Sequence, residues 1–313
     1  MADDGLMPGP RTKGPYDPDR RTLYSPAELL AGSENGLSLD DAVDRHFRHH
    51  QRRHPDDAAE ALAQRLHDYA IDQALQARIG ASPAQRAASR IVGIMGGHAV
   101  RRGDDAYRAA ARTGFLLASA DDPYLVATGG GPGVMEAGNL GAALSGRDER
   151  ELLAAIDRLA NGPEWRADPG AYLEAGLEVA AAHGPLRPSI AIPTWFYGNE
   201  PTNVFATEIV KYFSNGLREE GLLAICLHGI VYAPGSAGTL QEIFTDHAQN
   251  HYASYGYRSP MVFLGEQRYG RIFELLRAEA TSGVEPLLVL VETPEEVVAA
   301  IEERRPVAVD QPK

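Results

Sequence analysis

The arrangement that most constrains this chain is a short β-rich run followed by a glycine-rich turn and then by a helical pattern, which recurs after residue 90. Such an alternation of strands and helices predicts an α/β fold with a doubly wound parallel sheet. The predicted strands cover residues 91–95, 124–128, 189–192, 230–233, 261–264 and 287–291. Helices are predicted over about 104–118, from 133 to about 144, after 239 and from about 293.

The chain before residue 89 has a different character. Residues 1–24 are rich in Pro, Gly, Asp and Arg, which indicates a mobile arm or one that wraps the body. From residue 25 the pattern is helical, because Ser25-Pro-Ala-Glu28 has the form of a capping box and apolar residues recur three and four apart between 59 and 79. We therefore predict an arm and helical extension over 1–88 and an α/β domain over 89–305, with a helical insertion at about 147–184.

Composition excludes several classes of partner. The 30 basic and 43 acidic residues give a formal net charge of −13, and no long basic block gathers the basic ones, so we expect neither nucleic acid nor an anionic membrane as a partner. The longest mainly apolar stretch, residues 221–233, is shorter than the roughly twenty residues of a membrane-spanning helix. Residues 1–10 lack the apolar core of a secretory signal, and we therefore expect a cytoplasmic protein.

Few residues are placed for redox, triphosphate or metal chemistry. Cys226 is the only cysteine, which excludes an intrachain disulfide, and its apolar neighbours predict a buried structural side chain. No lysine follows a GxxxxG pattern, which excludes a Walker-type ATPase loop. Between residues 46 and 54, His46 and His50 are one helical turn apart and could share a metal ion. No third ligand continues their spacing, so we favour a solvated helix face and predict no metal site.

Two glycine-rich turns, residues 129–133 (GGGPG) and 234–239 (PGSAGT), each follow a predicted strand. Small residues let the backbone approach a ligand, and the free N–H groups and dipole of the following helix favour an anion there. Either turn alone could serve packing. Together, and with Gly96-Gly97-His98 as a third turn, they favour a phosphorylated small molecule at the carboxyl edge of the sheet.

Glu242 lies three residues after Thr239, so we expect it in the first turn of the helix that starts there. A carboxylate in that position has two interpretations. It is either a helix-start charge or capping partner, or a group that faces the ligand held by the same turn. The residues alone leave both open.

The segments 128–142, TGGGPGVMEAGNLGA, and 234–242, PGSAGTLQE, resemble the LOG family of phosphoribohydrolases, first known from cytokinin activation. The segments 200–208, EPTNVFATE, and 228–231, HGIV, are similar to the related bacterial nucleotide 5′-monophosphate nucleosidases. The resemblance covers roughly residues 90–265. It implies a Rossmann-like nucleotide-binding domain, a homodimer or higher homo-oligomer, and hydrolysis of a nucleoside 5′-monophosphate to free base and ribose 5-phosphate without a metal or redox cofactor.

The family signature, PGGxGTxxE, implies that Glu242 is the catalytic glutamate. The partner arginine of the family matches Arg218, which lies one residue farther from the proline than the family spacing. Two residues depart from the family pattern. Ser236 replaces the second glycine of the signature, and Gln241 replaces an acidic residue that is common beside the catalytic one.

The resemblance also implies roles. Glu242 would stabilise the positive charge that develops on the ribose and activate water, while Arg218 would hold the phosphate or a ribose hydroxyl. The leaving base would take its proton from His98, Asp246 or solvent. Expected phosphate contacts are Gly235, Ser236, Gly238 and Thr239; expected ribose contacts are Gly129, Gly130 and Gly131; and further site residues are Gly97, Gly133 and Glu136.

The sequence also bears on three other functions. Members of the family often carry a lysine decarboxylase label, but a pyridoxal-phosphate enzyme needs a Schiff-base lysine, and only Lys211 lies within the predicted fold, with nothing around it to mark that role. Ser236 and the shifted Arg218 motivate a nucleotide- or cofactor-binding carrier or sensor as the main alternative. A structural or interaction protein that uses the helical extension is the third hypothesis.

Overall fold

The computed structural model describes residues 15–31, 50, 57–197 and 200–309. In this part of the chain a seven-stranded parallel sheet has the order β4-β3-β2-β1-β5-β7-β8. Its strands are β1 Ile91–Met95, β2 Leu125–Thr128, β3 Ile190–Ala191, β4 Glu208–Ile209, β5 Ile230–Tyr232, β7 Met261–Leu264 and β8 Leu288–Val291. The predicted parallel α/β sheet is confirmed, and its strand order reverses between β1 and β5, where sheets of this class bind ligands.

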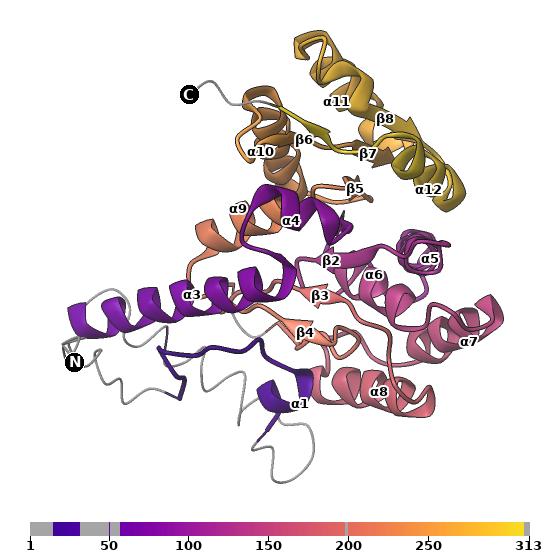
Figure 1. The fold of residues 1–313 in the computed structure, drawn as a ribbon. Helices are drawn as coiled ribbons and strands as arrows, with labels where there is room; N and C mark the ends of the chain where they lie inside the picture. The colour runs from indigo at the N-terminus through magenta and orange to yellow at the C-terminus, as the bar shows by residue number, and fades with distance from the viewer. Residues whose placement is uncertain (1–14, 32–49, 51–56, 198–199, 310–313) are drawn as a thin grey trace.

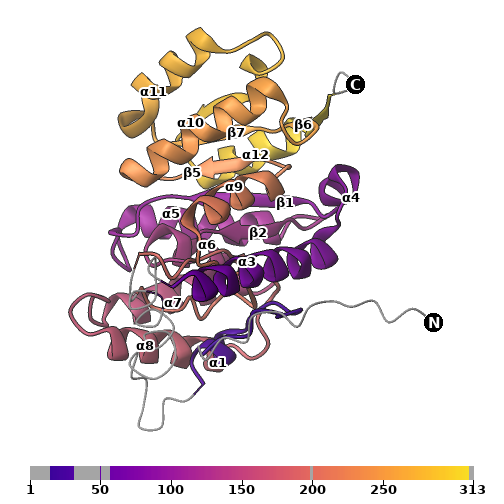
Figure 2. The same cartoon turned by 90° about the vertical axis from the view of Figure 1, so that its left-hand side faces the viewer.

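Helices cover both faces of the sheet (Figure 1), because alternate residues of each central strand point to opposite sides. On one face lie α3 Ala58–Ile79, α9 Asn215–Ile225, α10 Ala237–Tyr252 and α11 Glu266–Glu279. On the other lie α5 Asp105–Ala118, α6 Val134–Ala143, α7 Glu149–Ala160, α8 Pro169–Ala182 and α12 Pro294–Glu303. Figure 2, viewed from the side of α3, shows α3 and α9 in front of the strands. The fold is therefore doubly wound.

The helical extension packs on the same core as the sheet. Ile71 and Leu75 of α3 share a buried cluster with Ile91 of β1. Two short helices, α1 Pro26–Leu29 and α4 Pro83–Ala88, flank α3 in the sequence, and each follows a serine whose hydroxyl caps it. Tyr24 forms an isolated antiparallel bridge with Ile209 of the edge strand β4. The division of the chain at residue 88 stays a prediction, and the arm falls largely outside the described residues.

Several predicted elements differ from the structure. The helix after the PGSAGT turn begins at Ala237, two residues before Thr239, so Glu242 is its sixth residue and lies beyond the first turn. The third strand spans two residues rather than four. Sequence reasoning missed β4 and a two-stranded antiparallel sheet of β6 Tyr257–Arg258 and β9 Val307–Ala308. The insertion predicted at 147–184 is helical, as α7 and α8 show.

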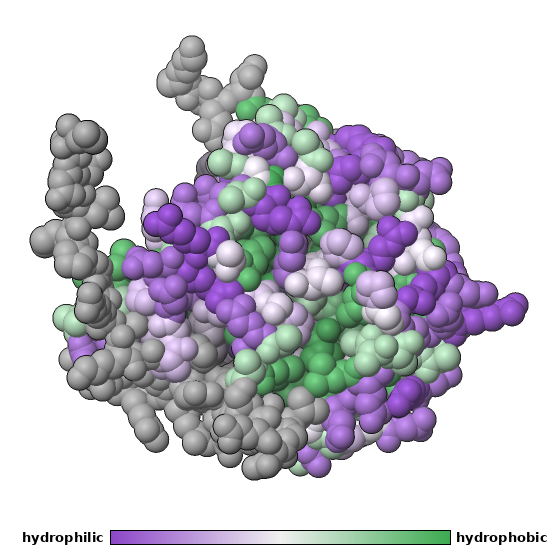
Figure 3. All heavy atoms as spheres, turned by 60° about the horizontal axis from the view of Figure 1, so that its bottom comes forward, coloured by the Kyte–Doolittle hydropathy of each residue, from purple (hydrophilic) through white to green (hydrophobic). Residues whose placement is uncertain are grey.

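The predictions about single residues and surfaces have mixed outcomes. Cys226 is fully buried as predicted, and burial raises the pKa of its thiol. The run from His46 to His54 lies outside the described residues except for His50, which is buried beside Gln64. Within the described ranges, no helix has the length and apolar character to cross a membrane. The face shown in Figure 3 mixes hydrophilic areas with smaller hydrophobic patches.

Candidate active site

A cavity of about 410 Å³ lies where the strand order reverses, beyond the carboxyl ends of β1 and β5. The turn after β1, residues 96–98, forms part of its lining, and the turn after β5 together with the start of α10, residues 236–239, forms another part. Arg218 and Glu242 also line it. The structure therefore places the two proposed catalytic residues in the same cavity as two of the three glycine-containing turns.

The three turns are joined by backbone hydrogen bonds. The Gly97 N–H donates to the Pro234 carbonyl at 3.0 Å, and the Gly97 carbonyl accepts from the Val134 N–H at 3.2 Å. Gly133, at φ 71°, fits under this contact because a Cβ there would overlap the Gly97 carbonyl. The edges of β1, β2 and β5 are thereby held as one rigid rim.

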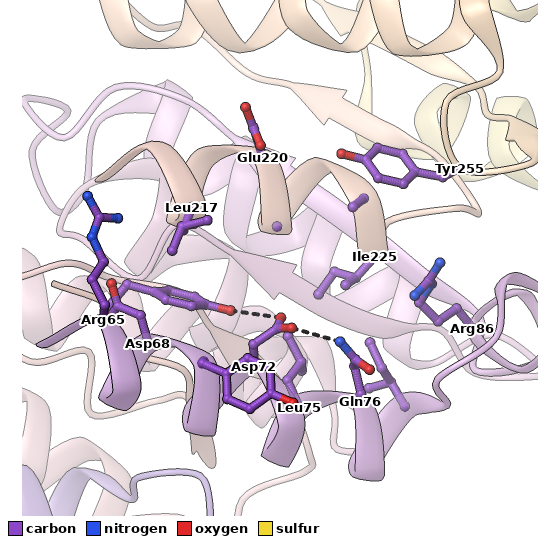
Figure 4. A pocket seen from close by; sticks show the side chains of 15 residues that line it. Arg65, Asp68, Asp72, Leu75, Gln76, Arg86, Leu217, Glu220, Ile225 and Tyr255 are labelled. Carbon is purple, nitrogen blue, oxygen red and sulfur yellow. Dashed lines mark hydrogen bonds between the residues drawn. The ribbon is translucent and has the colours of Figure 1, made fainter. Parts of the chain in front are cut away.

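A second cavity, the α3–α9 groove, is less suited to a phosphorylated ligand. It has a volume of about 370 Å³ and lies between α3 and α9 (Figure 4). Along it the Asp72 carboxylate accepts hydrogen bonds from the Tyr212 hydroxyl and the Gln76 amide. None of its described lining residues belongs to a glycine-rich turn. We therefore assign the candidate active site to the cavity at the sheet edge.

The PGSAGT turn is shaped for close approach at the start of α10. The Thr239 side chain packs onto Gly235, where a Cβ would overlap it, whereas a Cβ on Gly238 meets no described heavy atom within 4 Å. Ser236, the N-cap of α10, has φ −115° and is exposed, so a serine is accommodated there without strain. The side chain of Arg268 donates to the Gly235 carbonyl at 2.9 Å and fixes the turn from α11. The first N–H groups of α10 thus face a preformed, ligand-sized space.

Arg218 is held by backbone carbonyls at two strand ends. It is 7% exposed; its Nε donates to the Ile192 carbonyl at 2.8 Å, and its Nη2 donates to the Gly129 carbonyl at 3.1 Å. Its third nitrogen, Nη1, lies 3.6 Å from Glu242 Oε1. A Cβ on Gly129 would overlap Nη2, so the first glycine of the GGGPG turn leaves room for the guanidinium. The arginine is positioned beside Glu242 despite its shifted spacing in the sequence.

The start of α9, which carries Arg218, is fixed by the helical extension. The Asp68 carboxylate of α3 accepts hydrogen bonds from the Phe213 and Ser214 N–H groups, both at 2.8 Å. Asp68 is 1% exposed. The Ser214 side chain then caps α9 by accepting from the Leu217 N–H. A buried carboxylate far away in the sequence therefore sets where the helix of Arg218 begins.

Glu242 is a largely buried carboxyl group with an altered proton affinity. Burial raises its pKa to about 7, Arg218 lowers it in part, and the charge of Glu219 adds to the increase. A group with a pKa near neutrality can both hold and release a proton at physiological pH, as a general acid or base requires. Because Glu242 is the sixth residue of α10, the helix-start interpretation does not apply to it.

The structure gives Gln241 a partner of its own at the cavity rim. Its amide donates to Glu219 Oε2 at 2.8 Å, and the Tyr197 hydroxyl donates to Glu219 Oε1 at 3.2 Å. A carboxylate at position 241 would instead meet another carboxylate. Glu219 lines the cavity beside Arg218, so this amide helps to hold a negative charge at the rim.

The GGGPG turn contributes to the site mainly by making room for side chains that line the cavity. Gly130, at φ 74°, lines a separate cavity of about 10 Å³ together with Glu200 and Lys211. Gly131 lies next to Glu200 and Met135, which both line the main cavity. A Cβ on Gly131 would come within 3.2 Å of Glu200 Oε2 and would crowd Met135. Direct contact of these glycines with a ribose stays a prediction.

Two expected polar groups turn out to be structural. Glu136 is 3% exposed, and Arg102 donates to both of its carboxylate oxygens, at 2.7 and 2.8 Å. The Tyr107 hydroxyl donates a third hydrogen bond at 2.7 Å. Asp246, fully buried, accepts from the Tyr232 hydroxyl at 2.8 Å, and burial raises its pKa to about 7. Neither carboxylate is among the described lining residues of the cavity, so the expected contact of Glu136 with the ligand is corrected.

Sequence reasoning missed several lining residues. Trp165 and Arg166 come from the connection between α7 and α8, and Tyr197 and Glu200 come from the loop after β3. Arg166 Nη2 lies 3.0 Å from His98 Nε2. Because Trp165 and Arg166 belong to no glycine turn and no motif, only their position in the fold identifies them. In the described residues, no group of three or more His, Cys, Asp or Glu side chains is arranged to hold a metal ion.

Comparisons with known proteins gave matches among solved structures only, since no protein-family model and no curated protein matches the chain. A molybdenum cofactor binding protein from Rippkaea orientalis is 12% identical with a TM-score of 0.42, covering 69% of this chain and 96% of that one. The Moco carrier protein from Chlamydomonas reinhardtii is 16% identical with a TM-score of 0.43 and the same coverage. A structural genomics target, TM1055, is 18% identical with a TM-score of 0.43, covering 69% of this chain and 99% of that one. Each is a similarity of fold.

Proposed function

We propose that the protein hydrolyses the N-glycosidic bond of a nucleoside 5′-monophosphate and releases the free base and ribose 5-phosphate. The observation that carries this proposal is the pair of Glu242 and Arg218, 3.6 Å apart, in a cavity that also contains the N-terminus of α10. A carboxylate, a cation and an anion-binding helix start are the three groups that this reaction needs. The resemblance of residues 128–142 and 234–242 to phosphoribohydrolase motifs supports the same reaction.

The proposed reaction follows from these positions. The 5′-phosphate binds at the start of α10, where Gly235, Ser236, Gly238 and Thr239 surround the free N–H groups. As the bond between C1′ and the base nitrogen breaks, its electron pair leaves with the base and the ribose becomes positively charged.

The carboxylate of Glu242 stabilises that charge and accepts a proton from the attacking water, whose oxygen forms the new bond to C1′. Arg218 donates to a ribose or phosphate oxygen and keeps the sugar beside the carboxylate. Protonation of the leaving base by solvent completes the reaction.

The test is incubation of the purified protein with AMP, GMP, IMP, CMP and UMP, with free base and ribose 5-phosphate measured separately. Glu242→Gln keeps the shape of the side chain and removes its charge, whereas Glu220→Gln changes an exposed carboxylate of α9 outside the cavity lining and serves as the control. We expect release of both products by the unchanged protein and by the control, and a loss of at least a hundredfold in Glu242→Gln. Binding of nucleotides without release of base from any of the five would refute the proposal.

Ser236 supports a second candidate, a nucleotide- or cofactor-binding carrier or sensor. Its side chain is exposed at the phosphate turn and lines the cavity, where its hydroxyl can hold a phosphate without promoting reaction. This function predicts stoichiometric retention of a nucleotide through gel filtration with no turnover. Ser236→Gly would then weaken retention, whereas for the hydrolase it would leave turnover in place.

We also propose that the chain assembles into a homodimer or a higher homo-oligomer. Large apolar side chains are exposed on two helices of one face, among them Leu62 and Tyr69 of α3 and Tyr252 of α10. Exposed apolar groups of this kind favour association. Light scattering on the purified protein measures the mass directly, and a monomer across the accessible concentration range would refute assembly.

A further inference from the structure

The cavity has a wall that belongs to neither glycine turn. Trp165 and Arg166 lie between the last residue of α7, Ala160, and the first residue of α8, Pro169, and both line the cavity. The chain has two tryptophans. Trp195 is fully buried in the core, whereas Trp165 is half-buried and presents part of its indole to the cavity. A half-exposed tryptophan at a cavity wall is a surface on which a flat ligand can stack.

Arg166 connects this tryptophan to the first glycine turn. Its guanidinium carbon lies 4.9 Å from the centroid of the Trp165 ring, and its Nη2 lies 3.0 Å from His98 Nε2. A guanidinium can only donate, so Nε2 of His98 accepts, and the neutral imidazole carries its proton on Nδ1. The wall therefore combines an aromatic face with cationic and neutral N–H donors.

The segment that carries this wall is held in place by its own contacts. The Glu164 carbonyl accepts from the Ala167 and Asp168 N–H groups, which closes a turn around Trp165 and Arg166. The Glu164 carboxylate pairs with Arg101 of the loop after β1, and Asp168 caps α8 by accepting from the Ala171 N–H. Both ends of the turn are thus anchored, one to the loop after β1 and one to α8.

We propose that Trp165 and Arg166 form the base-recognition wall of the site, with an aromatic nucleobase stacked on Trp165 and its acceptor atoms facing Arg166 and His98. This inference rests on the proposed function and adds to it a binding site for the base, which the glycine turns do not provide. The phosphate is placed at the start of α10 and the ribose at Glu242 and Arg218. Trp165 and Arg166 bring an aromatic face and a guanidinium to the lining, whereas Tyr197, which also lines the cavity, donates its hydroxyl to Glu219.

Tryptophan fluorescence tests the proposal without requiring turnover. In the Glu242→Gln background, Trp195→Phe leaves Trp165 as the single tryptophan and Trp165→Phe leaves Trp195. We expect AMP and UMP to change the emission of Trp165 in the first variant, ribose 5-phosphate to change it far less, and neither nucleotide to change the emission of Trp195 in the second. Equal responses to AMP and ribose 5-phosphate, or none from Trp165 with nucleotide bound, would overturn the proposal.

Binding and kinetics supply the second measurement. Trp165→Ala is expected to weaken AMP binding and to raise its KM roughly tenfold or more, with a smaller effect for Trp165→Phe and little change in ribose 5-phosphate binding. Arg166→Met should weaken AMP binding, whereas Arg150→Met, which removes an exposed arginine of α7, is the charge-matched control. An unchanged KM in Trp165→Ala would refute the wall and leave the hydrolase standing. A nucleotide-specific response of Trp165 in a protein that hydrolyses none of the five nucleotides would refute the hydrolase and leave the wall standing.

Discussion

Replacing Glu242 by glutamine is predicted to stabilise the protein above neutral pH, although it removes the proposed catalytic group. Burial raises the pKa of Glu242 from 4.5 to about 7. The folded protein therefore binds this proton more tightly than the unfolded chain. A difference of about 2.5 pKa units corresponds to roughly 3 kcal/mol at about 1.36 kcal/mol per unit.

The direction of the pH dependence follows from the two pKa values. Below about pH 4.5 the carboxyl group is protonated in both states, and its burial carries no charge penalty. As the pH rises from about 4.5 to about 7, the unfolded chain loses its proton first, so the free energy of unfolding falls. Above about 7 the folded protein also ionises and the loss is complete. This pH dependence of the unfolding free energy is opposite in sign to that of a carboxylate whose pKa is lowered by an ion pair.

Urea unfolding of both proteins between about pH 4.5 and 8.5 measures the effect. We expect the difference in unfolding free energy, Glu242→Gln minus unchanged protein, to grow by about 2–3 kcal/mol over this range. A constant effect of the amide on Arg218 cancels, because only the change with pH is compared. Glu220→Gln, on the exposed side of α9, should show a small and nearly constant difference. A difference that stays flat or falls with pH would mean that Arg218 outweighs burial and would refute the reasoning.

Gly129→Ala and Asp68→Ala test how the site is supported, and Lys211→Met tests a buried cation outside the lining of the site. Gly129→Ala should displace Arg218, because a Cβ at that position would overlap the guanidinium. We expect kcat/KM to fall at least tenfold and the free energy of unfolding to fall by roughly 1 kcal/mol. Gly238→Ala, whose Cβ would meet open space, should unfold at the same or a higher urea concentration, and an equal loss of activity in both variants would contradict this prediction. Asp68→Ala removes the acceptor of two backbone N–H groups at the start of α9 and should cost about 2–4 kcal/mol in urea unfolding, so a cost near zero would show that α9 is positioned otherwise. Lys211→Met should raise the free energy of unfolding by about 2–3 kcal/mol near pH 7, because burial lowers the pKa of Lys211 to about 8 and the charged form is disfavoured in the fold. That gain should shrink as the pH rises from about 8 to about 10.5, and a gain independent of pH would refute it.

The central strands and turns could be predicted because their signals are local. An apolar β-rich run that ends in a glycine cluster determines both a buried parallel strand and the turn that follows it, as in β1, β2 and β5. The edge strand β4 could not be predicted from the sequence, since its two residues form a strand only by pairing with β3 and with Tyr24. The helix after the PGSAGT turn begins two residues before its predicted start, because Ser236 and Gly238 are residue types typical of turns.

The candidate site was predictable where it lies beside a motif and not where it depends on partners elsewhere. Glu242 and Arg218 came from the sequence resemblance, and the structure places them 3.6 Å apart. Glu136 has the same kind of signal, since it also follows a glycine turn, but Arg102 and Tyr107 occupy its carboxylate. No pattern within the sequence indicates that an arginine thirty-four residues earlier pairs with it. A motif thus locates a side chain on an element, and long-range packing decides what the side chain faces.

The parts of the chain outside the quoted motif segments therefore affect the site in two separate ways. Asp68 in the helical extension acts on position, because it fixes the start of the helix that carries Arg218 while lying outside the cavity lining in the described residues. Trp165 in the insertion acts on recognition, because it lines the cavity itself. These two effects separate in kinetics: loss of a positioning residue lowers kcat with every nucleotide, whereas loss of the wall raises KM to an extent that depends on the base. If Asp68→Ala and Trp165→Ala instead changed the same constant to the same extent for all five nucleotides, the division between a positioning and a recognition residue would be refuted.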